Sequence, residues 1–87
     1  MSLKGKVALV TGSTSGIGLA IAQAFAAQGC NIMLNGFGDA AAIEKIRTDL
    51  AKQHGVSVEY NGADMSKSAE IAKLVATTQA TFGSLDI

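Results

Sequence analysis

The sequence has 87 residues, of which 48% are hydrophobic and 16% charged, and its formal net charge is zero. This is an ordinary globular composition, and without a basic excess neither nucleic acid nor an anionic membrane is a favoured partner. No apolar run reaches the length of a transmembrane helix. The run that Thr11 and Gly12 interrupt near the N-terminus is too short for a signal peptide, so we expect a cytoplasmic protein.

Strand-like and helix-like patterns alternate along the chain. The expected strands span residues 6–11, 31–35 and 56–61, and a fourth begins at 85–87. The expected helices span residues 16–28, the stretch between the capping residue Asp39 and Gly55, and a segment that Ser66 opens. The residues at helical spacing are Ile17, Ile21, Ala24, Phe25 and Gln28 in the first helix, Ile43, Ile46 and Leu50 in the second, and Ile71, Leu74, Val75 and Phe82 in the third.

The character of the strands predicts the order of the sheet. The runs VALV and IML within the first two expected strands are continuously apolar, which is typical of parallel strands covered on both faces. Residues 56–61 alternate apolar and polar side chains, which suits an edge. We therefore predict an α/β fold, the Rossmann-type βαβαβα half of a doubly wound parallel sheet. Its strand order is 3-2-1(-4), and the chain ends in the fourth strand.

The segment TGSTSGIG, residues 11–18, follows the first strand and opens the first helix. Gly12 turns the chain, Gly16 lets the backbone approach a pyrophosphate, and Gly18 lets helix and strand pack closely. The helix N-terminus offers N–H groups and a positive dipole end to phosphates. Three glycines also occur in purely structural turns, but this strand–loop–helix context favours dinucleotide binding. A P-loop is excluded, because Leu19 follows Gly18 where that motif needs lysine.

This segment resembles the TGxxxGIG fingerprint of the short-chain dehydrogenase/reductases, and Asp64-Met65-Ser66 resembles that family's acidic turn beside the adenine ring. The resemblance covers the whole chain and implies a nicotinamide cofactor. The cofactor-binding residues that we expect are Gly12, Ser13, Thr14, Ser15, Gly16, Ile17, Gly18, Asn35, Phe37, Asp64 and Met65.

The expected cofactor is NAD, although the residue that usually holds its ribose is absent. An Asp or Glu is expected about 20 residues after the glycine loop, and that place holds the neutral Asn35. NADP-binding relatives usually place Arg or Lys in the loop or after the second strand, whereas no Lys or Arg occurs between Lys6 and Lys45. A 2′-phosphate would thus meet no cation. Uncharged ribose hydroxyls can still bond Asn35 and the Gly36-Phe37 backbone, and Phe37 offers a flat face to adenine.

The resemblance also implies what lies outside the sequence. In this family the catalytic Asn, Ser, Tyr and Lys follow the fourth strand, so we expect no catalytic residue among residues 1–87. Tyr60 is not the catalytic tyrosine, because Asp64 stands where the family needs lysine. The parent protein is expected to be an oxidoreductase that acts on a small hydroxy acid or ketone. The family further suggests a homotetramer formed through other segments.

Two alternatives remain open on these residues. One is a non-catalytic nucleotide-binding module, either a truncated paralogue or a redox sensor, and the other is a dehydrogenase for a different secondary alcohol. We also expect residues 1–87 to be the N-terminal part of one NAD-binding domain that does not fold stably alone. No Cys/His cluster suggests a metal site, and the single Cys30 is expected to be a buried structural thiol.

Overall fold

A computed structural model describes residues 3–87 as alternating strands and helices. The elements are β1 (Val7–Val10), α1 (Gly16–Ala27), β2 (Asn31–Asn35), α2 (Ala40–His54), β3 (Val58–Asn61) and α3 (Ser68–Phe82). None of the helices among these residues is long and apolar enough to cross a membrane.

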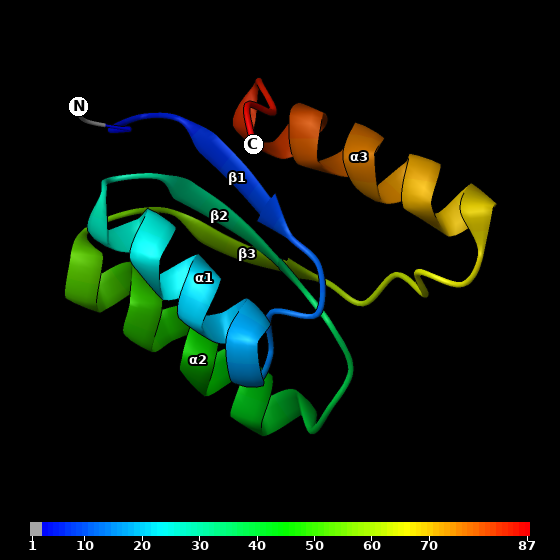
Figure 1. The fold of residues 1–87 in the computed structure, drawn as a ribbon, viewed down its shortest axis with the longest axis horizontal. Helices are drawn as coiled ribbons and strands as arrows, with labels where there is room; N and C mark the ends of the chain where they lie inside the picture. Colours follow the sequence, from blue (N-terminus) through cyan, green and yellow to red (C-terminus); the bar gives the residue numbers. More distant parts are fainter. Residues whose placement is uncertain (1–2) are drawn as a thin grey trace.

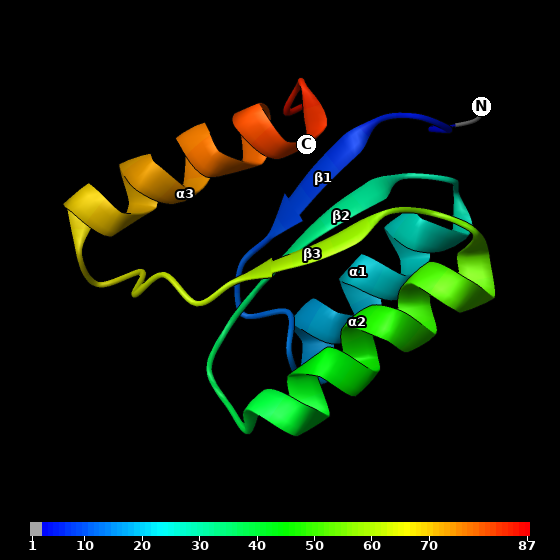
Figure 2. The ribbon, with the colours of Figure 1, turned by 180° about the vertical axis from the view of Figure 1, so that it is seen from behind.

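The three strands form a parallel sheet in which β2 lies between β1 and β3. Val7 is in register with Asn31, and Asn35 is in register with Asn61, so the carboxyl ends of β2 and β3 finish level. Helices α1 and α2 cover one face of the sheet, and α3 crosses the other (Figure 1; Figure 2 shows the reverse side). This is the predicted Rossmann-type arrangement, with β3 at the edge.

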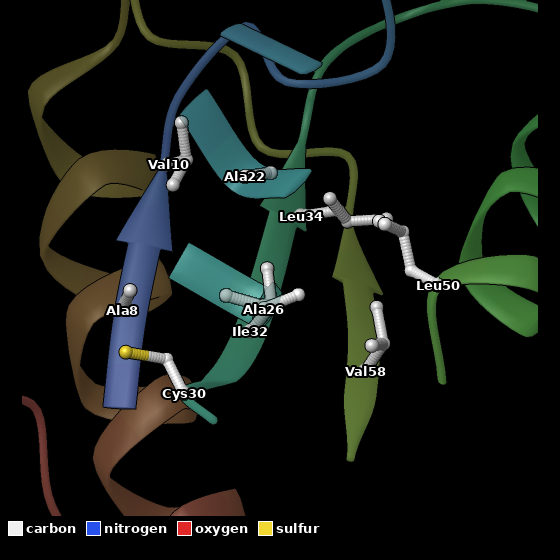
Figure 3. Packing of buried hydrophobic residues seen from close by; sticks show 9 residues of the cluster. All are labelled: Ala8, Val10, Ala22, Ala26, Cys30, Ile32, Leu34, Leu50 and Val58. Atoms are coloured by element: carbon white, nitrogen blue, oxygen red, sulfur yellow. The ribbon is translucent and has the colours of Figure 1, made fainter. Parts of the chain in front are cut away.

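The main hydrophobic core lies between the sheet and helices α1 and α2 (Figure 3). Alternate strand residues point into it, as the period of two in a strand requires. The core cluster consists of Ala8, Val10, Ala22, Ala26, Cys30, Ile32, Leu34, Leu50 and Val58. Cys30 is fully buried, with its Sγ 3.6 Å from the carbonyl oxygen of Leu3, so the prediction of a structural thiol is confirmed.

The residues predicted at helical spacing in α1 are only partly those that face the core: Phe25 packs against the core, and Ile17 and Ile21 do not. The buried residues of α1 are Ala22 and Ala26, whereas Ile17 is 82% exposed and Ile21 is 43% exposed. The helix packs through small side chains because it approaches the sheet closely. Larger apolar residues on the neighbouring face are therefore left outside the contact.

Both ends of α2 follow the prediction, but the start of α3 does not. Asp39 caps α2 by accepting a hydrogen bond from the N–H of Ala42 at 2.9 Å, and Gly55 ends the helix in the left-handed conformation at φ 66°. Helix α3 was expected to open at Ser66, but its N-cap is Lys67. The hydroxyl of Ser66 is instead bonded to Asp64.

Residues 85–87 do not form the expected fourth strand, but their backbone bonds to β1. Asp86 and Ile87 both donate to the carbonyl of Val7 at 3.0 Å, and Leu9 donates to the carbonyl of Ile87 at 2.9 Å. These bonds use the side of β1 that faces away from β2. The chain thus enters the position predicted for a fourth strand without completing one.

Candidate nucleotide-binding site

A cleft of about 370 Å³ lies at the carboxyl ends of the strands, where the glycine loop meets the segments that follow β2 and β3. Ligands of open parallel α/β sheets bind in such crevices. The lining residues come from three segments that are distant in sequence. They are Gly12, Thr14, Ser15, Asn35, Gly36, Phe37, Ala63, Asp64, Met65 and Ser66.

The glycine loop delivers the N-terminus of α1 to this cleft. Gly12 and Gly16 have φ angles of 60° and 58°, in the left-handed region that glycine adopts without strain. Ser15, the N-cap residue, makes no side-chain hydrogen bond to the helix, and no acidic residue occupies the first turn. The first N–H groups of this 12-residue helix therefore keep their positive field for an anionic ligand.

Gly18 sets the distance between the helix and the loop. A Cβ atom placed on it would overlap the carbonyl oxygen and carbon of Gly12, which are backbone atoms and have little freedom to move. Any larger residue would force α1 away from the end of β1. The predicted packing role of Gly18 is therefore confirmed by the geometry.

Ser13 and Asn35 join the glycine loop to the end of β2. The N–H of Ser13 donates to the carbonyl of Asn35 at 2.6 Å, and the N–H of Asn35 donates to the Ser13 hydroxyl oxygen at 3.0 Å. That hydroxyl lies 3.3 Å from the same Asn35 carbonyl, and both side chains are buried. The Ser13 hydroxyl was expected to bond a phosphate or ribose, and it instead makes hydrogen bonds within the protein.

The Asn35 side chain also has an internal role. Its Nδ2 donates to the carbonyls of Asn61 and Ala63, each at 3.0 Å, and its Oδ1 lies 3.4 Å from the Gly12 nitrogen. With 1% of its surface exposed and both amide protons bonded, it has no donor left for a ribose. The neutral residue at this position is explained by its contacts, because a carboxylate cannot donate to two carbonyls.

The segment after β2 is held from two sides. The hydroxyl of Thr14 donates to the carbonyl of Phe37 at 3.0 Å, and the hydroxyl of Tyr60 donates to the carbonyl of Gly36. Gly36 packs so tightly on Thr14 that a Cβ atom would overlap the threonine hydroxyl. Phe37 is 69% exposed at the border of the cleft, where its ring is open to a planar ligand.

The acidic turn forms the third wall. The hydroxyl and the N–H of Ser66 both donate to Oδ1 of Asp64, at 2.7 and 2.9 Å, and they hold the pKa of that carboxyl below its usual range. Glu70 accepts a hydrogen bond from the N–H of Asp64 at 3.0 Å and so ties the turn to α3. Asp64 therefore stays ionised at neutral pH, beside the cleft.

The structure brings most of the predicted residues together. Seven of them line the cleft: Gly12, Thr14, Ser15, Asn35, Phe37, Asp64 and Met65. Gly16, Ile17 and Gly18 form the adjoining first turn of α1, and Ser13 lies beneath the loop. The sequence analysis had named the Gly36 backbone and the turn that contains Ser66, but it missed Ala63 as a lining residue and Tyr60 as a support. The spacing Asp64-x-Ser66 is that of a side-chain-bonded turn and could have indicated the hydrogen bond between these two residues.

The glycine loop, the parallel sheet and the cleft agree with the protein family that the sequence matches. Residues 6–87 match the family described as short chain dehydrogenase, and the chain belongs to that family.

Two curated relatives share one name. The chain is 57% identical over 86 residues to D-beta-hydroxybutyrate dehydrogenase of Cupriavidus necator, a match that covers 98% of the chain. It is 46% identical over 82 residues to the D-beta-hydroxybutyrate dehydrogenase of Rhizobium meliloti, covering 94% of the chain. In both comparisons the chain spans 32% of the relative, about one third of its length.

Solved structures agree on the fold. The L-sorbose reductase of Gluconobacter frateurii, complexed with NADPH and L-sorbose, matches with a TM-score of 0.88 and 35% identity. The NADPH-dependent 3-quinuclidinone reductase of Rhodotorula rubra matches with a TM-score of 0.91 and 32% identity. These matches cover 99% and 98% of the chain and 32% of each reductase.

Proposed function

We propose that this chain is the cofactor-binding segment of an NAD-dependent oxidoreductase. The observation that carries the proposal is the cleft at the strand ends, into which the uncapped N-terminus of α1 is delivered by Gly12 and Gly16. A pyrophosphate held there would meet backbone N–H groups and the positive end of the helix. The bound cofactor would supply the hydride-accepting ring, while these residues bind and orient its adenosine and phosphate groups.

The charges around the cleft favour NAD over NADP. Among the residues that line it, Asp64 is the one charged side chain, and it is negative. A 2′-phosphate would bring close to two further negative charges into the same cleft without a lysine or arginine to meet them. The NADPH named for the two solved reductases is a property of those proteins, and the residues present here support the cofactor that lacks the phosphate.

The proposed reaction is the interconversion of D-3-hydroxybutyrate and acetoacetate. It rests on two relatives of that name, at 57% and 46% identity over nearly the whole chain. In the oxidative direction the C3 hydrogen would leave as hydride to the nicotinamide, and the hydroxyl proton would pass to a base. We infer that the catalytic residues lie in segments outside these 87 residues. The inference is supported by the matches to the two relatives, which cover about one third of each.

The test is titration of the full-length protein with each cofactor, followed by turnover assays. We expect NAD to bind at least tenfold more tightly than NADP, and D-3-hydroxybutyrate to be oxidised in the presence of NAD. Equal binding of the two cofactors would refute the NAD preference. Oxidation of other secondary alcohols without 3-hydroxybutyrate would refute the substrate. Cofactor binding without any turnover would favour a non-catalytic nucleotide-binding module.

A further inference from the structure

Three consecutive carbonyl groups, at the last residue of β2 and the two residues after it, are turned back into the protein. The carbonyl of Asn35 accepts from Ser13, that of Gly36 accepts from the Tyr60 hydroxyl, and that of Phe37 accepts from the Thr14 hydroxyl. Within residues 3–87, the N–H of Phe37 donates no hydrogen bond, whereas Gly36 directly follows Asn35, which is paired with Asn61. Gly36 and Phe37 both line the cleft. The segment therefore directs these three carbonyls towards the protein and keeps the Phe37 N–H for a ligand.

Tyr60, like Ser13, belongs to this arrangement but does not line the cleft. Its ring packs against the hydrophobic core, and its hydroxyl reaches from β3 across to the Gly36 carbonyl. Gly62 leaves room for that hydroxyl, because a Cβ atom placed on Gly62 would lie 2.9 Å from it. The Tyr60 hydroxyl thus anchors a loop that contains two glycines, Gly36 and Gly38.

We propose that Tyr60 is a positioning residue for the adenosine half of the dinucleotide, acting through Gly36; this inference rests on the proposed function. Gly36 and Gly38 have φ angles of 155° and 151°, and glycine loses more conformational freedom on ordering than any other residue. A loop that is already held by Tyr60 has less freedom to lose when a ligand binds. The ordered loop presents the uncharged N–H donor of Phe37, which suits a hydroxyl oxygen of an adenosine ribose.

The test uses Tyr60→Phe in the full-length protein, with binding of NAD, AMP and nicotinamide mononucleotide measured by calorimetry or NMR titration. Removing one hydroxyl is expected to weaken NAD and AMP by the same factor, roughly three- to tenfold. Binding of nicotinamide mononucleotide and the value of kcat are expected to stay unchanged. A role limited to global stability would weaken both mononucleotides equally.

Gly62→Ala provides an independent variant that keeps the tyrosine. The added methyl group displaces the Tyr60 hydroxyl, so AMP binding is expected to weaken in the unmodified background and to show no further loss in Tyr60→Phe. Thr48→Val is the matched control, because it removes a hydroxyl that is bonded to the carbonyls of Glu44 and Lys45 on the exposed face of α2. It is expected to leave all three ligands unaffected.

The outcomes separate this inference from the proposed function. If the unmodified protein binds neither NAD nor AMP, the proposed function fails and this inference fails with it. If it binds both and Tyr60→Phe binds AMP equally well, the positioning role alone is refuted. Additive effects of Gly62→Ala and Tyr60→Phe would also refute it, since both variants are expected to act on the same hydrogen bond.

Discussion

Ser13 and Asn35, 22 residues apart, are locked together by hydrogen bonds in both directions. Each residue donates its backbone N–H to the other, and the Ser13 hydroxyl oxygen is the acceptor for Asn35. Neither side chain has more than 1% of its surface exposed. The glycine loop is therefore fixed to the end of β2 before any ligand arrives.

Ser13→Ala is expected to reduce the free energy of unfolding by about 1–3 kcal/mol, because it leaves the buried N–H of Asn35 without an acceptor. Urea denaturation of the full-length protein measures this change. Ser57→Ala is the control: Ser57 is exposed, and its hydroxyl makes no hydrogen bond within residues 3–87. That variant is expected to stay within about 0.5 kcal/mol of the unmodified protein. Equal stability of both variants would contradict the proposed lock.

Asn35→Asp introduces the carboxylate that the family pattern leads one to expect, and we predict that it harms the protein. The new oxygens would face the carbonyls of Asn61 and Ala63 in a buried position, with a loss of at least about 3 kcal/mol at neutral pH. Burial raises the pKa of such a group, so the loss should shrink in acid as the neutral carboxyl regains one donor.

The matched variant for this prediction is Phe37→Asp, which places the same carboxylate on a side chain position that is 69% exposed. Its stability is expected to remain within about 0.5 kcal/mol of the unmodified protein. Denaturation curves of both variants at pH 5 and pH 7 make the comparison. A stable Asn35→Asp variant at pH 7 would show that the amide donors are dispensable.

Comparing Gly18→Ala with Gly55→Ala separates the cost of a steric overlap from the cost of a positive φ angle. At Gly18 the added methyl group overlaps the Gly12 carbonyl, so we expect loss of more than about 3 kcal/mol together with weaker cofactor binding. At Gly55 the Cβ meets no atom within 4 Å, and the positive φ of 66° alone should cost about 1 kcal/mol. Thermal unfolding and NAD titration of both variants give the two readouts. Similar losses at the two sites would contradict the close approach of α1 to the loop.

The acidic turn has a pH signature. Ser66 stabilises the ionised form of Asp64, so the pKa of Asp64 in the folded protein lies below its unfolded value of about 3.9. A lowered folded pKa adds stability that is present above pH 4 and is lost as the pH falls through the folded pKa. NMR titration of the Asp64 carboxyl measures that pKa, and Ser66→Ala is expected to raise it towards the ordinary range. An unchanged pKa in the variant would show that the hydroxyl has no part in the shift.

The strands and the loop were predictable because their signals are local. Continuous apolar runs mark the covered strands, and glycines at positions 12, 16 and 18 need only their strand–loop–helix context to be interpreted. The cap at Asp39 and the stop at Gly55 are likewise decided within one turn of helix. The family pattern then brought distant segments into one site, and the cleft joins seven of the eleven residues so predicted.

The buried face of α1 and the role of Asn35 depend on partners that periodicity does not reveal. Alanine carries a weak hydrophobic signal, so Ala22 and Ala26 were passed over in favour of the larger Ile17 and Ile21. The closeness of the helix to the sheet, which selects small residues, is a tertiary property. Asn35 was read as a ligand contact because its hydrogen-bond partners on β3 and the following loop lie 26 and 28 residues away.

The tethered carbonyls after β2 also determine where this protein is open to redesign. Asn35 is occupied by internal bonds, and Gly36 has no room for a side chain beside Thr14. Phe37 and Ser15 are exposed and line the same cleft. A cofactor switch by laboratory selection is therefore expected to place its new charges at residues 15 and 37. Side chains at these two positions can be exchanged without breaking a side-chain hydrogen bond that holds the loop.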